Sequence, residues 1–281
     1  EHMRMMISLN MAGFFYCGAD VGGFGCDASA ELIVRWTQLG AVTPLFRNHS
    51  AMGTRRQEPW AFDDHTTALV RGAIKLRYAL MPYIYSEFMR CAAALTPFIS
   101  PLFLTYADPV SAETGDQFMV GRSLMAAPVH APNAAGRFVH LPGRSWLYWA
   151  ASSADDREVA VLPPGAHYVN AGLDELPLFI AEDSLIALDA SGGAIGETRN
   201  LTVVGLVASR AAFTYNDDDG ETTEFENGVF SELKIEVINR GGYFETQVSK
   251  KESPGRPLKI RTIDFEIYDG AGRMTAIKTV V

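Results

Sequence analysis

The pattern of the chain changes once, at Thr96-Pro97. Before this point, apolar runs, a glycine loop and helical periodicity alternate, whereas after it short apolar runs are separated by Gly, Pro, Asn and Asp. Alternation of strands and helices predicts a parallel sheet, and closely spaced strands with turn residues between them predict an all-β region. We therefore expect an α/β part over residues 1–95 and only strands behind it.

The α/β part holds too few strands for a complete α/β fold. Residues 14–17 (FFYC) suit a buried parallel strand, and residues 41–46 suit a second one despite Pro44. We expect one helix over residues 1–12 that ends at Gly13 and a second that is capped by Asp27 or Ser29 and stops at Gly40. A third helix is expected from about residue 64 to about 95, with a kink at Pro82. A (β/α)8 barrel needs eight strands and a doubly wound sheet about six. Residues 1–95 are therefore expected to be the tail of a larger α/β domain or to pair with another chain.

The β-only part is expected to form two domains. Strands are predicted within residues 117–129, 136–141, 145–149 and 176–180, and a second group over residues 201–281. The small residues at 190–194 (ASGGA) are typical of a linker. The expected domains are therefore residues 1–95, 96–190 and 191–281.

Charge and cysteine content exclude several kinds of function. The chain carries 24 Lys and Arg against 33 Asp and Glu, which gives a net charge of −9. We therefore expect no nucleic-acid partner and no membrane partner, because both surfaces are anionic. Cys17, Cys26 and Cys91 are too few and too scattered for a disulfide framework or a zinc site. Low cysteine use favours a cytoplasmic protein.

The start of the chain is not that of a signal peptide. It opens Glu1-His2-Met3, and Met3, Met6 and Ile7 follow helical spacing at once. Because the chain opens inside an amphipathic helix, we expect it to be cut from something longer.

Two polar clusters directly follow the two expected strands. One is Asp20 in a loop with four glycines among residues 18–25, and the other is Arg47-Asn48-His49. Ligands bind at the carboxyl ends of parallel strands, and a carboxylate beside a glycine loop suits a sugar or phosphate site. Phe24 lies inside this loop and could offer an apolar face to a sugar ring. The alternative is that Asp20 caps a helix and His49 is an ordinary loop histidine.

Three other patterns are weaker. Residues 23–28 fit a dinucleotide loop, but no acidic residue ends the following strand at 43–48, where the ribose contact belongs. Residues 215–220 (YNDDDG) resemble a calcium loop but lack an acidic first ligand, so a hairpin turn is favoured. Glycosidases need two carboxylates. Glu58, Asp63 and Asp64 are the candidate partners of Asp20, and they are more simply a turn and a helix cap.

Several longer motifs resemble glycoside hydrolase family 31, the family of α-glucosidases and α-xylosidases. They are residues 18–24 (GADVGGF), 40–49 (GAVTPLFRNH), 57–60 (QEPW) and 81–86 (MPYIYS), and the similarity continues through 117–129 and 215–220. The resemblance implies the last part of a (β/α)8 TIM barrel, followed by a proximal and a distal β-sandwich domain. Residues 14–19 and 41–46 would be the seventh and eighth barrel strands.

The resemblance also implies roles for single residues. Asp20 and His49 would line the subsite that holds the non-reducing glucose, Phe24 would wall the same subsite, and Arg47 would orient its neighbours. The family's W-x-D-M-N-E-like motif with the nucleophile and its G-D-N-like motif with the acid/base do not occur in residues 1–281. Both catalytic groups are therefore expected upstream of this chain, which alone would be inactive.

The implied function is that of the C-terminal part of a retaining exo-α-glucosidase. No metal or cofactor is expected. The expected partners are an α-glucoside oligosaccharide substrate and either the missing N-terminal half or another copy of the chain. The alternatives are another reaction on the same framework, such as that of an α-xylosidase, a transglucosylase or a lyase, and a non-catalytic carbohydrate-binding module.

Overall fold

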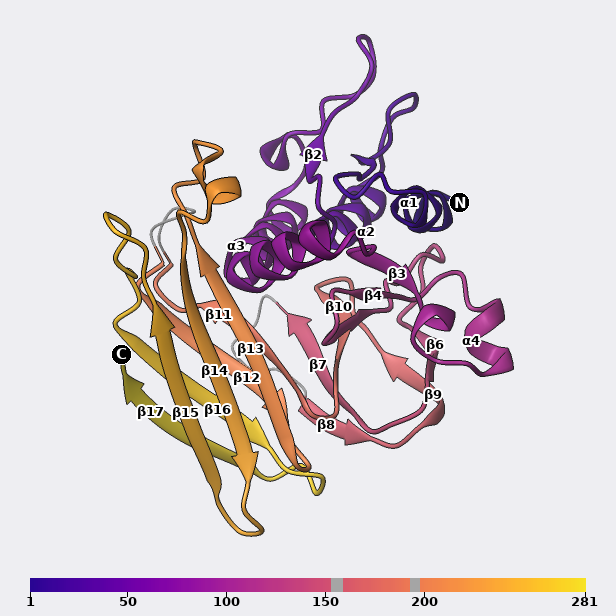
Figure 1. Ribbon diagram of the computed structural model, residues 1–281. Helices are drawn as coiled ribbons and strands as arrows, with labels where there is room; N and C mark the ends of the chain where they lie inside the picture. Colours follow the sequence, from indigo (N-terminus) through magenta and orange to yellow (C-terminus); the bar gives the residue numbers. More distant parts are fainter. Residues whose placement is uncertain (153–158, 193–197) are drawn as a thin grey trace.

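The computed structural model describes residues 1–152, 159–192 and 198–281. The helices are α1 (His2–Met11), α2 (Ala30–Ala41), α3 (Asp64–Ala94) and the short α4 (Pro109–Glu113). The first three lie together at one side of the molecule, and the sheets fill the rest (Figure 1). Among the described residues, no helix is long and apolar enough to cross a membrane.

The three long helices form where the sequence predicts them, because their ends are set by local interactions. The Ser29 side chain accepts the Leu32 N–H at 3.2 Å and caps α2. Asp27 instead accepts the Arg55 N–H at 2.6 Å. α2 continues past the expected stop at Gly40 to Ala41. α3 spans 31 residues with Pro82 inside it, and it ends at Leu95 in the left-handed conformation (φ 52°).

The two predicted barrel strands are wrong in position and length. Residues 14–19 and 41–46 are not strands, and Phe14 and Tyr16 are exposed. The observed strands are β1 (Asp20–Val21) and β2 (Arg47–Asn48), which pair in parallel with Asp20 opposite Arg47. A parallel strand is stabilised by a neighbour at each edge and by cover on both faces. Within the described chain β1 and β2 have only each other, so their ladder is short.

The described residues of the β-rich part form four sheets. The first has the strand order β3-β4-β5-β10-β7-β8, and β6 pairs with β9 beside it. The other two have the orders β11-β12-β16-β17 and β13-β14-β15. All these ladders are antiparallel except β12–β16.

The strands are β3 (Ile99–Pro101), β4 (Phe118–Val120), β5 (Leu124–Ala126), β6 (Gly136–Leu141), β7 (Trp146–Ser152), β8 (Val159–Leu162), β9 (Gly165–Asn170), β10 (Glu175–Ala181), β11 (Ser184–Asp189), β12 (Asn200–Leu206), β13 (Arg210–Asp217), β14 (Ser231–Asn239), β15 (Phe244–Lys251), β16 (Thr262–Tyr268) and β17 (Met274–Val280). Each β segment predicted between residues 117 and 180 therefore contains a strand. Of the expected linker at 190–194, residues 193 and 194 lie outside the described residues.

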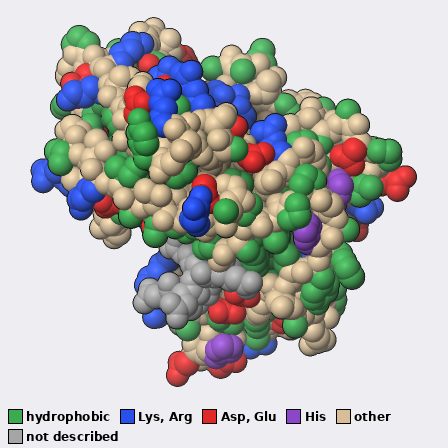
Figure 2. All heavy atoms as spheres, turned by 90° about the horizontal axis from the view of Figure 1, so that it is seen from below, with side chains coloured by type: hydrophobic (Ala, Val, Ile, Leu, Met, Phe, Trp, Pro, Cys, Tyr) green, Lys and Arg blue, Asp and Glu red, His purple; other side chains and the backbone are tan. Residues whose placement is uncertain are grey.

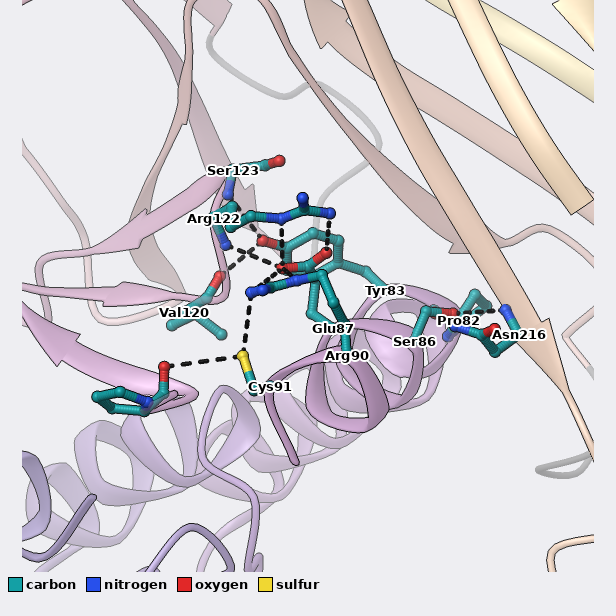
Figure 3. Close-up of polar contacts among 11 residues, drawn as sticks. Pro82, Tyr83, Ser86, Glu87, Arg90, Cys91, Val120, Arg122, Ser123 and Asn216 are labelled. Carbon is teal, nitrogen blue, oxygen red and sulfur yellow. Dashed lines mark hydrogen bonds and ion pairs between the residues drawn. The ribbon is translucent and has the colours of Figure 1, made fainter. Parts of the chain in front are cut away.

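α3 connects the two parts of the molecule. The Tyr83 hydroxyl donates to the Val120 carbonyl at 2.6 Å and accepts the Ser123 N–H at 3.1 Å. One turn further, the Ser86 hydroxyl accepts the Asn216 N–H from β13 at 3.0 Å. Figure 3 shows these contacts leaving one stretch of α3 in two directions, toward the turn between β4 and β5 and toward β13.

Glu87 is the buried charge of this region. Its side chain is only 3% exposed and accepts the Arg122 N–H at 3.1 Å, and its carboxylate pairs with the guanidinium groups of Arg90 and Arg122 at 3.0 Å each (Figure 3). Gly121, which precedes Arg122, has φ +64°, and a Cβ there would lie 2.8 Å from a Glu87 oxygen. The turn between β4 and β5 therefore fits closely over this carboxylate.

Arg35 on α2 makes a second connection to the β-rich part. Its buried guanidinium donates to four carbonyls that lie about 100 to 140 residues away in sequence, at 2.9 to 3.2 Å. The acceptors are Ala134, Ala171, Gly172 and Glu175. Burial lowers the pKa of Arg35, and the neighbouring carboxylates of Glu31, Asp174 and Glu175 oppose this effect.

Candidate functional site

The structure brings the four predicted site residues together at β1 and β2. Asp20 and Arg47 are register partners, so their side chains meet directly. Arg47 Nε donates to Asp20 Oδ1 at 2.9 Å, and a second guanidinium nitrogen contacts the same oxygen. The Asp20 side chain is 20% exposed, which leaves the carboxylate open to a ligand at one side. Both Arg47 contacts fall on Oδ1, so Oδ2 remains for a hydroxyl donor.

Phe24 and His49 form the second half of the candidate site. Their ring centroids lie 5.4 Å apart with an interplanar angle of 35°. The Ala51 N–H donates to the Phe24 carbonyl at 2.8 Å, which ties the loop after β1 to the loop after β2. Phe24 is 52% exposed, so it presents an aromatic surface to solvent beside the imidazole.

The loop after β1 requires glycine at two successive positions. Gly22 and Gly23 have φ of +86° and +88°, a conformation that other residues rarely adopt. A Cβ at Gly22 would also lie 2.5 Å from Gln57 Oε1. The Gly23 N–H donates to the Asp20 carbonyl at 2.9 Å and closes the turn that carries the chain from Asp20 to Phe24.

Sequence reasoning gave no role to Gln57, which lies beneath the site. Gln57 is 4% exposed, and its Nε2 donates to the Val21 carbonyl and to Asn48 Oδ1, both at 3.3 Å. Asn48 Nδ2 donates back to the Gln57 carbonyl at 2.7 Å. Gln57 therefore holds β1 and β2 together directly behind Asp20 and His49. The only signal for it was its place in the QEPW motif.

The other acidic candidates have structural roles. Asp63 accepts the Thr66 N–H at 2.7 Å and caps α3, as predicted, and hydrogen bonds from Thr66 lower the pKa of Asp63. Residues 218–230 join the antiparallel strands β13 and β14, which confirms a hairpin connection. Within that loop Asp219 accepts the Thr222 N–H at 2.9 Å and pairs with Arg256 at 2.8 Å. In the part of the chain that the structure describes, no group of three or more His, Cys, Asp or Glu could hold a metal ion.

The chemistry of this site suits a hydroxylated ring. A carboxylate accepts hydrogen bonds from hydroxyl groups, and such charge-assisted bonds are stronger than neutral ones. Phe24 offers an apolar face, and His49 can donate or accept a hydrogen bond. Arg47 fixes the orientation of the carboxylate but uses only one of its oxygens.

Two family models match the chain in consecutive segments. The model described as "Glycosyl hydrolases family 31 TIM-barrel domain" matches residues 1–87. The model described as "Glycosyl hydrolase family 31 C-terminal domain" matches residues 95–186. The two matches together cover most of the chain.

Curated relatives and solved structures agree with this assignment. "Alpha-glucosidase 2" of Bacillus thermoamyloliquefaciens is 35% identical over 246 residues, which are 84% of this chain and 30% of that protein. "Neutral alpha-glucosidase C" of Mus musculus is 37% identical over 191 residues, which are 67% of this chain and 21% of that protein. The family 31 dextranase of Flavobacterium johnsoniae, solved with glucose, superposes with a TM-score of 0.83 at 26% identity over 95% of this chain and 34% of that one. The chain thus spans about a third or less of the length of these proteins.

Proposed function

This chain belongs to glycosyl hydrolase family 31, and from that premise we propose that it forms the C-terminal part of a retaining exo-α-glucosidase. The observation that carries the proposal is the meeting of Asp20, Phe24, Arg47 and His49 at β1 and β2. The relatives more than 30% identical to the chain support an α-glucoside as substrate, since their names are those of α-glucosidases.

In the proposed reaction, this chain binds the terminal glucose. Asp20 accepts hydrogen bonds from sugar hydroxyls, His49 contributes a further polar contact, and Phe24 covers an apolar face of the ring. Arg47 keeps the Asp20 carboxylate in place. The nucleophile, which forms the glycosyl-enzyme intermediate, and the acid/base, which protonates the leaving oxygen and then activates water, are proposed to lie upstream.

Exposed hydrophobic side chains around the α/β part support an upstream partner. Phe14, Tyr16 and Trp60 are 65%, 68% and 76% exposed, although residues of this size are normally covered. We propose that the upstream half, or another copy of the chain, packs on this surface. The 281-residue chain alone is expected to self-associate in light scattering, and a monodisperse stable monomer would contradict this.

Hydrolysis of an aryl α-glucoside tests the proposed function. The full-length protein that carries this chain should hydrolyse it, and Asp20→Ala should lower kcat/KM roughly 10- to 100-fold, because the charge-assisted hydrogen bond to the free Oδ2 of Asp20 is lost. The 281-residue chain alone should show no turnover. Turnover by this chain that Asp20→Ala abolishes would refute the upstream placement of the catalytic pair. Faster hydrolysis of an aryl α-xyloside would instead support an α-xylosidase.

A further inference from the structure

The outer face of the β6–β9 sheet carries two adjacent exposed aromatic side chains. Phe138 and Tyr168 are direct cross-strand partners, with ring centroids 5.2 Å apart and an interplanar angle of 74°. They are 73% and 55% exposed, whereas Val139 and Val169, which are their neighbours along the strands, are buried. The inner face of this sheet, with Val139 and Val169, therefore packs on the core, and the aromatic pair on the outer face is not part of the core. Two large apolar side chains side by side on a surface are typical of a binding site.

The Tyr168 ring lies across the sheet over Gly136. A Cβ at Gly136 would lie 2.9 Å from the Tyr168 hydroxyl oxygen. The Val169 carbonyl oxygen would be closer still, so a side chain at position 136 would clash with the backbone of β9 as well as with the tyrosine. Glycine at position 136 leaves room for the Tyr168 side chain, which meets Phe138 in an edge-to-face contact.

A polar hollow lies at the next position along the same face. His140 follows Phe138 by two residues, so both side chains are on the outer face of β6. His140 Nε2 lies 3.1 Å from Asp108 Oδ1, and both residues line a hollow of about 450 Å³ together with Pro142 and Gly165. This volume is within the ~300–1,000 Å³ of typical ligand pockets. In the view from below, hydrophobic side chains lie beside histidines at the right of the molecule, the side on which β6 and β9 lie (Figure 2).

Several charges at this surface are paired, but the exposed Arg144 lies beside the hollow, with its guanidinium 6.0 Å from the Tyr106 ring, and donates to the Glu182 carbonyl at 3.2 Å. Asp108 is matched by His140, and Ser111 donates its N–H and hydroxyl to the same carboxylate at 2.9 and 2.5 Å. The Arg137 guanidinium is 11% exposed, donates to the Pro128 carbonyl at 2.7 Å and pairs with Asp116 at 2.9 Å. A nucleic-acid site is typically a cluster of free cations, whereas Arg137 is paired here and Arg144 stands apart from it, so a neutral ligand is favoured.

We propose that Phe138, Tyr168 and the hollow at Asp108 and His140 form a second binding site, for a neutral oligosaccharide. The electron-rich face of an aromatic ring attracts the polarised C–H groups of a sugar ring. The carboxylate and imidazole beside it can bond the hydroxyls of the next sugar unit. The site is separate from Asp20 and His49. The choice of an α-glucan as ligand rests on the proposed function, whereas the assignment to a neutral sugar does not.

Binding of maltoheptaose to the 281-residue chain, measured by calorimetry, tests the second site. Phe138→Ala and Tyr168→Ala should each weaken the Kd at least fivefold. Tyr243→Ala is the matched control, because Tyr243 is a similarly exposed aromatic residue (64%) in the β14–β15 hairpin. It should leave the Kd unchanged. Maltoheptaose could also reach the proposed glucose subsite, so the aromatic variants are compared in an Asp20→Ala background, where the binding that remains should depend on Phe138 and Tyr168.

Three results would overturn parts of the inference. Wild-type affinity in Phe138→Ala, with the fold intact by circular dichroism, would show that the aromatic pair does not bind the sugar. Failure of the wild-type chain to bind any of maltoheptaose, cellohexaose and xylohexaose would remove the site. Binding of cellohexaose in preference to maltoheptaose would overturn the choice of an α-glucan. The α-glucosidase activity of the full-length protein is measured separately. Failure of the proposed function can therefore be told apart from failure of the second binding site.

Discussion

Replacing Glu87 with Gln removes the one buried carboxylate that ties α3 to the turn between β4 and β5, while its shape is kept. Hydrogen bonds to a charged group contribute about 1.5–3 kcal/mol, against about 0.5–1.5 for neutral ones. The difference is roughly 1 kcal/mol for each of the three donating groups, which are the Arg122 N–H and the guanidinium groups of Arg90 and Arg122. The two side chains are 29% and 59% exposed, so solvent screens part of their share. We expect a loss of about 2 kcal/mol in the free energy of unfolding.

Urea unfolding measures this loss. Fluorescence of the buried Trp146 and Trp149 and far-UV circular dichroism should give coincident transitions if unfolding is two-state. The matched control is Arg122→Gln, which removes only an exposed partner of Glu87 and should cost at most about 1 kcal/mol. If Glu87→Gln changed stability by less than about 0.5 kcal/mol, or if both variants lost the same amount, Glu87 would not be the centre of this contact.

Three further changes have expected outcomes. Gly22→Ala should destabilise the chain by about 1–3 kcal/mol more than Gly53→Ala in urea unfolding, because both have positive φ but only Gly22 would also clash with Gln57. Gln57→Ala in the full-length protein should raise KM for an aryl α-glucoside more than it lowers kcat, and equal kinetics would contradict a positioning role. Burial raises the pKa of Asp217, with Asp218 adding to the rise, so ionisation of Asp217 opposes folding. Asp217→Asn should therefore raise the Tm at pH 7, and this gain should shrink as the pH falls below the folded-state pKa; a Tm gain independent of pH would refute this.

The ends of the helices were predictable because the interactions that set them are local. Ser29 and Asp63 each accept an N–H three residues ahead, and Gly13 follows α1 with φ +93°. Such contacts can be found by reading a few residues along the chain. The observed helices, His2–Met11 and Asp64–Ala94, therefore lie within one residue of the predicted bounds 1–12 and 64–95 at every end.

The strands of the α/β part were not predictable in the same way. An apolar run such as residues 14–17 forms a strand only if other strands lie beside it. The sequence of the run does not identify those neighbouring strands. The resemblance implied one subsite for Asp20 and His49, and the structure pairs Asp20 with Arg47 across β1 and β2. Gln57 was missed because its contact with Val21 crosses 36 residues and no local pattern marks it. The roles of Asp20, Phe24, Arg47 and His49 in sugar binding remain predictions.

The four carbonyls held by Arg35 restrict how this protein can be divided. The change of pattern at Thr96-Pro97 invites a cut there, as if residues 1–95 and the strands behind them were independent modules. Such a cut would take away the guanidinium and leave its acceptors, one before β6 and three from the end of β9 to the start of β10, without their donor. A β-rich part expressed alone should therefore need a replacement for Arg35 before it is soluble and ordered. Because the acceptors are main-chain carbonyls, recombination between relatives should succeed where the parent of α2 supplies an arginine at position 35 and the other parent keeps the same backbone path at these carbonyls.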